Sequence, residues 1–215
     1  LKLNRKLNIL FLSTSSDLFK ITFKTYSDFI DKVSAFADKV VLKENRGGSR
    51  AYDYLTNQKY DIPSQTMPIV HSVGVGDVYD IATVYLSNNN NFEVALYYAS
   101  WIAANYASTT FPDDFKQLTM STLQIPNTEL KSLQGCSLPW EIRQNFNIYI
   151  AAPDFDFVNT EPIEKLCSSL IYHNFKPRRP IKENGQMSQN ASKEERLLLF
   201  SKDMKLLDEC DLLIA

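Results

Sequence analysis

The segment Val73-Gly74-Val75-Gly76-Asp77 has the residue types of a phosphate-binding turn. It follows the strand-like residues Pro68–Val70 and opens an apolar segment, residues 77–87, that we expect to be a buried helix. Glycine lets backbone N–H groups turn toward a ligand, and the N-terminus of a helix adds the positive end of its dipole. The sequence therefore predicts an anion site at residues 74–76.

Asp77 has two interpretations at the end of this turn. Its carboxylate can cap the helix by accepting a backbone N–H group. Beside a bound phosphate it can instead take the proton from an attacking hydroxyl group, as a general base does. The sequence leaves both interpretations open, and only the second gives the turn a catalytic role.

The turn stands in a segment with the alternation of strands and helices that is typical of α/β proteins. Strand, helix and strand predict a parallel pair. Gly47 and Gly48 follow the second strand, and a polar hairpin-like stretch then continues through Pro63. The expected elements are a strand at Ile9–Leu12, a helix capped by Ser27 with Phe29, Ile30, Val33 and Ala37 on one face, a strand at Val40–Leu42, and buried helices at 77–87 and 92–108.

A second α/β unit is expected after a linker. The predicted division gives residues 1–130 to the first unit, 131–146 to the linker and 147–215 to the second unit. The elements expected there are a strand at 147–151, a helix at 160–174 capped by Thr160, a loop at 177–191, a helix at 192–209 opened by a capping box of Ser192 and Glu195, and a strand at 211–215. We expect the two strands to be parallel neighbours that one crossover joins.

Composition excludes several classes of function. The 23 basic and 25 acidic residues give a net charge of −2, which provides no basic field for nucleic acid. No long apolar run or signal segment occurs, so the sequence predicts a cytoplasmic protein without membrane contact. Cys136, Cys167 and Cys210 are far apart and lack metal-site spacing, and His71 has no second histidine nearby. Reduced thiols and no metal centre are therefore expected.

Residues 41–49, residues 71–80 and the helix at 95–107 resemble the C-terminal half of the PfkB/ribokinase carbohydrate kinases. The resemblance covers about residues 7–115. That family has the signature D-T-x-G-A-G-D, in which the G-A-G amides form an anion hole and the last Asp is the catalytic base. The resemblance implies a ribokinase-like fold, with Gly74, Val75 and Gly76 as the anion hole and Asp77 as the base.

The same resemblance implies ATP and Mg²⁺ as cofactors, with Lys43, Asn45 and Gly48 at the nucleotide. His71 and Ser72 stand where the family has Asp and Thr, a departure that bears on the accessory phosphate and metal contacts. The family's N-terminal half, which supplies most sugar contacts and a lid, has no counterpart in these residues. We expect either a piece of a longer protein or a remnant.

Residues 148–155, the loop at 180–185 and the pattern from Asp203 to Asp211 resemble the nucleoside 2-deoxyribosyltransferases. That family has a flavodoxin-like fold and transfers 2-deoxyribosyl groups through an ester on a glutamate. The resemblance implies that Tyr149 and Asp203 are catalytic, and it covers about the first half of that domain. The substrate contacts that it implies are Asp154, Phe155 and Asn184. The nucleophilic glutamate would follow the strand at 211–215 and matches no residue here.

Each of these residues also has an ordinary structural interpretation. Tyr149 can be a core tyrosine, and Asp203 can be a solvated residue on a helix. Arg178, Arg179 and Lys182 form a small basic cluster that either lies beside a substrate loop or is a solvated surface, and the second is favoured.

The sequence thus leads to two hypotheses about function. The first is part of a bifunctional salvage protein that phosphorylates a sugar or nucleoside with ATP and transfers or hydrolyses 2-deoxyribosyl groups. Its partners would be the small-molecule sugar or nucleoside and ATP, and a homo-oligomer is compatible with it. The alternative is a non-catalytic nucleotide-binding or scaffold module that keeps these folds without turnover.

Overall fold

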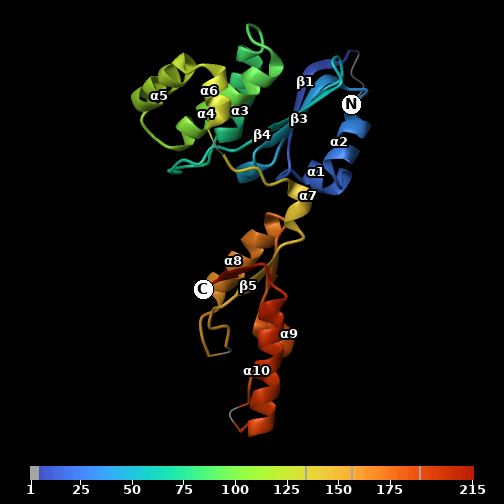
Figure 1. The fold of residues 1–215 in the computed structure, drawn as a ribbon, viewed down its shortest axis with the longest axis vertical. Coiled ribbons are helices and arrows are strands. Elements are labelled where there is room, and N and C mark those ends of the chain that lie inside the picture. The colour runs from blue at the N-terminus through green and yellow to red at the C-terminus, as the bar shows by residue number, and fades with distance from the viewer. Residues whose placement is uncertain (1–4, 134, 156, 189) are drawn as a thin grey trace. The chain divides into compact units, whose positions relative to one another are not determined.

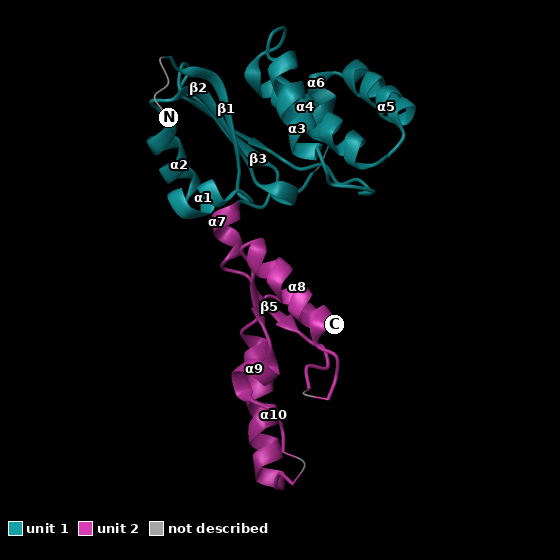
Figure 2. Cartoon of the chain, turned by 180° about the vertical axis from the view of Figure 1, so that it is seen from behind, with its two compact units in different colours: residues 1–139 teal, residues 140–215 magenta. Residues whose placement is uncertain are grey.

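A computed structural model describes residues 5–133, 135–155, 157–188 and 190–215 (Figure 1). The chain divides into two compact units, residues 1–139 and 140–215 (Figure 2). This division falls within the predicted linker at 131–146. Each unit contains its own sheet with helices beside it, so the expected α/β class is confirmed. Within the described part of the chain, every helix is too short or too polar to span a bilayer.

The sheet of unit 1 has the order β1-β2-β3-β4. Its strands are β1 (Leu7–Ser13), β2 (Ala37–Lys43), β3 (Ser49–Asp53) and β4 (Gln58–Ile62). β1 and β2 are parallel, with Ser13 opposite Lys43, whereas β2, β3 and β4 are antiparallel. The predicted parallel pair and the predicted hairpin are therefore both present, and the carboxyl ends of β1 and β2 meet at one edge.

Helices cover both faces of this sheet (Figure 1). One face carries α1 (Asp17–Thr22) and α2 (Tyr26–Val33), and the other carries α3 (Val75–Leu86) and α4 (Phe92–Ala107). Two further helices, α5 (Pro112–Gln124) and α6 (Asn127–Ser132), pack on α4. The core under α4 joins Val41 of β2 to Tyr79 of α3 and to Leu96 of α4, all of which are buried. Burial of this apolar face orients the first turn of α3 toward the sheet edge.

Four expectations for unit 1 need correction. α2 is capped by Thr25, whose hydroxyl accepts the Asp28 amide at 3.1 Å, and not by Ser27. Ala37 begins β2 instead of ending that helix. Residues 68–70 form no strand, because the Val70 amide donates to the carbonyl of Ala107 at the end of α4. α4 is buried as predicted, but α3 exposes one apolar face, formed by Ile81, Val84 and Tyr85.

The sheet of unit 2 is parallel and has the order β6-β5-β7. Its elements are α7 (Trp140–Arg143), β5 (Asn147–Ile150), α8 (Glu161–Tyr172), β6 (Lys176–Arg178), α9 (Pro180–Asn184), α10 (Lys193–Asp208) and β7 (Leu212–Ile214). β5 and β7 are parallel neighbours as predicted. The prediction that a single crossover joins β5 to β7 is wrong, because β6 lies between these two strands in the chain and pairs with the other side of β5. The loop predicted at 177–191 is therefore partly strand and partly helix.

The helices of unit 2 begin close to where their capping residues stand. Ser192 and Glu195 form both hydrogen bonds of the capping box, which confirms that prediction. Thr160 precedes α8 but its side chain makes no capping hydrogen bond. Ile148 and Ile150 of β5 pack with residues of α8 in a small apolar core. Because side chains alternate along a strand, Tyr149 lies on the opposite face of the sheet.

A buried ion pair next to β2 should matter for the stability of unit 1. Arg50 donates to both carboxylate oxygens of Glu44, at 2.9 and 2.5 Å, and the Glu44 side chain is 1% exposed. Arg50→Ala would leave a buried carboxylate without this partner, so we expect a loss of about 3 kcal/mol in the free energy of unfolding. Urea unfolding measures it. Lys32→Ala, which removes the exposed pair with Asp28, is the control and should cost less than about 0.5 kcal/mol. Equal effects of the two substitutions would contradict the prediction.

Candidate functional site

Gly74 is the residue before α3 and has a φ of +79°, in the left-handed region. A Cβ atom at this position would be strained, and it would lie 3.2 Å from the Tyr106 hydroxyl. The amides of the first helical turn, residues 75–77, have no partner within the helix. No described residue accepts a hydrogen bond from them. The predicted anion turn therefore presents a set of free N–H donors.

Asp77 is exposed in the first turn of α3. Its carboxylate makes no hydrogen bond or ion pair with any described residue, and α3 has no side-chain cap. Asp77 therefore does not cap the helix in this structure, which removes the first of its two interpretations. Its carboxylate remains available beside the free amides.

Lys43 reaches this turn from the carboxyl end of β2. Its Nζ atom donates to the carbonyl of Gly76 at 3.3 Å and to Oδ2 of Asp80 at 2.6 Å. A Cβ atom at residue 76 would lie 3.2 Å from this Nζ atom, so glycine gives the ammonium group its room. The structure thus brings Lys43 against the turn, while its implied contact with nucleotide stays a prediction.

Asp80 is a residue of this site that the sequence analysis missed. Burial raises the pKa of its carboxyl group, against the opposing effect of the hydrogen bond from Lys43, and the charge of Asp77 raises it further. Burial also raises the pKa of Tyr79, whose hydroxyl group shares a 2.7 Å hydrogen bond with Ser49 of β3. Two signals in the sequence could have suggested the pair of Lys43 and Asp80. One is a basic residue at the end of a strand, and the other is an acidic residue about one turn after the start of a later helix.

Asn45 and Gly48 shape the connection between β2 and β3. Both have positive φ, +55° and +91°, and a Cβ atom at Gly48 would lie 2.3 Å from the carbonyl oxygen of Ile62. No hydrogen bond between described residues joins them to residues 74–77. Their predicted contact with nucleotide stays a prediction, and their conformation explains why this connection needs these residue types.

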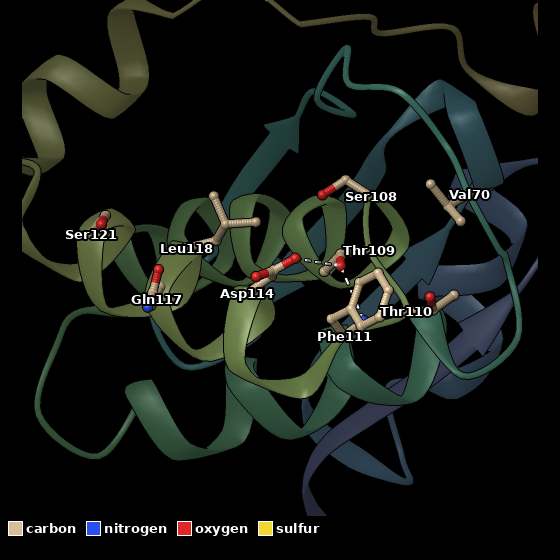
Figure 3. A pocket seen from close by; sticks show the side chains of 9 residues that line it. All are labelled: Val70, Ser108, Thr109, Thr110, Phe111, Asp114, Gln117, Leu118 and Ser121. Atoms are coloured by element: carbon tan, nitrogen blue, oxygen red, sulfur yellow. Dashed lines mark hydrogen bonds between the residues drawn. The ribbon is translucent and has the colours of Figure 1, made fainter.

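A pocket of about 550 Å³ lies between the loop before α3 and α5 (Figure 3). Val70 of the loop before α3 lies on one side and Leu118 of α5 on the other, with Asp114 between them. The imidazole Nε2 of His71, three residues before Gly74, lies 2.9 Å from the carbonyl oxygen of Thr109, a residue that lines the pocket. The lining residues are Val70, Ser108, Thr109, Thr110, Phe111, Asp114, Gln117, Leu118 and Ser121. No motif in the sequence predicted this pocket.

The residues of the turn are compatible with Mg²⁺ that arrives with a nucleotide. No three metal-ligating side chains converge in the described part of the chain. Asp77 nevertheless places one carboxylate in the first turn of α3, and Asp80 places another in the second turn. Proteins commonly hold Mg²⁺ through one or two carboxylates together with phosphate oxygens of the substrate.

Three of the residues predicted for unit 2 lie together. The Asn184 amide donates to Oδ1 of Asp203 at 2.8 Å. Burial raises the pKa of Tyr149, and the charges of Asp203 and Cys210 raise it further, so the phenol lies within electrostatic range of the carboxylate. Tyr149 is half-buried and faces away from the core under α8. β5, α9 and α10 therefore contribute one side chain each to a polar cluster.

The other two predicted residues lie in different surroundings. Asp154 is 8% exposed and accepts hydrogen bonds at 2.7 and 2.5 Å from Arg179, which is 9% exposed and also pairs with Glu164 at 2.7 Å. The interpretation of the basic cluster as a solvated surface is therefore wrong for Arg179. Phe155 is 38% exposed and its ring stacks on that of Phe157. Substrate binding by Asp154 and Phe155 stays a prediction.

Comparisons with known proteins give matches among solved structures. No family model and no curated protein matches the chain. A ribokinase from Thermotoga maritima is 17% identical over 55% of this chain and 43% of its own length, with a TM-score of 0.46. An Arabidopsis thaliana ribokinase with ribose and ATP is 17% identical over 55% and 41%, with a TM-score of 0.44. An Escherichia coli ribokinase II with ATP and Mg²⁺ is 16% identical over 54% and 39%, with a TM-score of 0.45.

These structures are carbohydrate kinases of the type that the sequence resembles. The chain spans about two fifths of the length of each. A TM-score below 0.5 does not establish a shared fold, so we draw no conclusion from these matches. They give no support to the resemblance of unit 2 to deoxyribosyltransferases.

The polar cluster of unit 2 has a measurable signature. Because the charge of Asp203 disfavours the phenolate of Tyr149, Asp203→Asn should lower the pKa of Tyr149. Burial is the larger cause, so the pKa should stay above its ordinary value. NMR titration with ¹³Cζ-labelled tyrosine, assigned with Tyr149→Phe, measures it. Asp208→Asn on the same helix is the control and should leave the titration unchanged. An unchanged pKa of Tyr149 in Asp203→Asn would show that the two residues do not interact, and would contradict the proposed cluster.

Proposed function

We propose that unit 1 is the nucleotide-binding portion of a kinase that phosphorylates a hydroxyl group of a sugar or nucleoside with ATP. The observation that carries this proposal is the free first turn of α3, whose amides have no described acceptor while Asp77 stands exposed beside them. Free amides at a helix N-terminus bind phosphate oxygens. An exposed carboxylate next to them has the position of a general base.

Each residue of the turn has a distinct part in this reaction. The amides of residues 75–77 would bind oxygens of the transferred phosphoryl group and stabilise the charge that develops on them. The ammonium group of Lys43 lies against the same turn and adds positive charge. Asp77 would accept the proton of the attacking hydroxyl group. When bound, Mg²⁺ would supply further neutralisation of the phosphate oxygens, with the exposed carboxylate of Asp77 as its candidate protein ligand.

The pocket beside the turn has the composition of a site for the base of the nucleotide. Its wall combines the exposed apolar side chains of Val70 and Phe111 with hydroxyl, amide and carboxylate groups. Such mixtures let a flat ring pack on one surface while polar groups fix its orientation. The contact between His71 and Thr109 links this pocket to the loop that leads into the turn. In this proposal a nucleotide whose base binds in the pocket would place its phosphates at the first turn of α3.

A second function is proposed for unit 2, the binding of a nucleoside as in 2-deoxyribosyl transfer or hydrolysis. It is supported by the cluster of Tyr149, Asn184 and Asp203. The strand order β6-β5-β7 is also that of the first three strands in a flavodoxin-like sheet. In such chemistry the carboxylate and the phenol would orient the sugar and the departing base, while the nucleophile would come from a residue outside this set.

The proposed base makes a direct prediction for catalysis. In the whole protein, Asp77→Asn should reduce turnover by about 10²–10⁴-fold and leave nucleotide affinity within about twofold, because a general base acts on the chemical step. Turnover is followed as ADP release with sugars and nucleosides as acceptors, and affinity by calorimetry.

Asp17→Asn, in the first turn of α1 on the opposite face of the sheet, is the matched control and should change neither quantity. An equal loss of affinity and turnover in Asp77→Asn would remove Asp77 as the base. Nucleotide binding without turnover on any acceptor would favour the non-catalytic module.

A further inference from the structure

Asp80 lies in the second turn of α3, and only one of its two carboxylate oxygens accepts a hydrogen bond from a described residue. Oδ2 accepts the 2.6 Å hydrogen bond from Lys43, while Oδ1 is buried and no described residue donates to it. The charged and titratable groups that face this carboxyl group are Lys43, Asp77 and Tyr79. Lys43 is the only cation among these three.

This arrangement is costly if its purpose is only to hold the helix on the sheet. A carboxylate loses hydration on burial, and an oxygen without a donor recovers none of it. The hydrogen bond between Ser49 and Tyr79 already joins β3 to α3 with neutral groups, one residue before Asp80. The negative charge of Asp80 therefore serves Lys43, which is its single ionic partner among the described residues.

Lys43 needs a partner because its side chain is long and the turn offers it one weak contact. The carbonyl oxygen of Gly76 lies at 3.3 Å, and a neutral acceptor at this distance does not fix an ammonium group on a flexible stem. The strong bond to Asp80 holds it there. The missing Cβ atom of Gly76 leaves the space that this position requires.

We propose that Asp80 is a positioning residue, which holds the ammonium group of Lys43 where it can interact with the phosphoryl group bound at residues 75–77. This inference rests on the proposed kinase function and adds a residue to its site. Asp80 touches neither nucleotide nor acceptor in this role. Its effect on phosphate binding passes entirely through Lys43.

A double-mutant cycle on nucleotide affinity tests this role. Calorimetry on the full chain would measure binding of the magnesium complex of AMP-PNP to the wild type, Lys43→Met, Asp80→Ala and the double variant. We expect each single variant to bind about tenfold more weakly, because each removes one charge-assisted contact. The double variant should bind no more weakly than Lys43→Met, since Asp80 acts only through Lys43.

The opposite sign would overturn the proposal. If Asp80 acts only as a negative charge near the phosphates, Asp80→Ala should tighten binding, both in the wild type and in Lys43→Met. Unchanged binding in Asp80→Ala would equally reject a positioning role. Absence of binding by the wild type would overturn the proposed kinase function itself and this role with it.

Asp80→Asn covers the case in which Asp80→Ala does not fold. Asparagine keeps the size of the side chain and an acceptor oxygen for Lys43 but removes the charge. Its affinity should fall between those of the wild type and Lys43→Met, and circular dichroism would verify its fold. Affinity equal to or above that of the wild type would contradict the proposal.

Discussion

The contact of Lys43 with the first turn of α3 is the interaction on which the site of unit 1 depends. It joins the end of β2 to a helix that starts more than thirty residues later, at an edge where β1 also ends. The opposite side of the turn is held by the loop at 70–71, whose amides bond to the end of α4. Between these two contacts, the amides of residues 75–77 have no acceptor among the described residues. A preorganised donor set of this kind needs little rearrangement when an anion binds.

Charge at this site is balanced among the protein's own groups. The positive helix end and Lys43 stand against the carboxylates of Asp77 and Asp80. Tyr79 packs into the core on the side of α3 that faces the sheet, so the charged groups lie on the other sides of this helix. Unit 2 uses its charges differently, because the buried pair of Asp154 and Arg179 satisfies both partners and leaves the polar cluster around Asp203 on the other face of β5.

The sequence predicted those features that local chemistry determines. Glycine spacing located the turn, the S-x-x-E pattern located the start of α10, and apolar runs located the paired strands. The strand prediction for residues 68–70 was wrong because a short apolar run has the pattern of a strand even where tertiary contacts make it a loop. β6 was missed because Pro177 interrupts it, which an edge strand tolerates. Asp80 and the pocket depend on contacts between distant segments, which no local pattern records.

A crystal structure of the chain with the magnesium complex of AMP-PNP tests the central claim most directly. The account predicts the terminal phosphate oxygens within about 2.7–3.2 Å of the amide nitrogens of residues 75–77, the base in the pocket between Val70 and Leu118, and Asp77 turned toward the open side of that phosphate. A nucleotide bound elsewhere, or an Asp77 carboxylate that occupies these amides in place of phosphate, would contradict it.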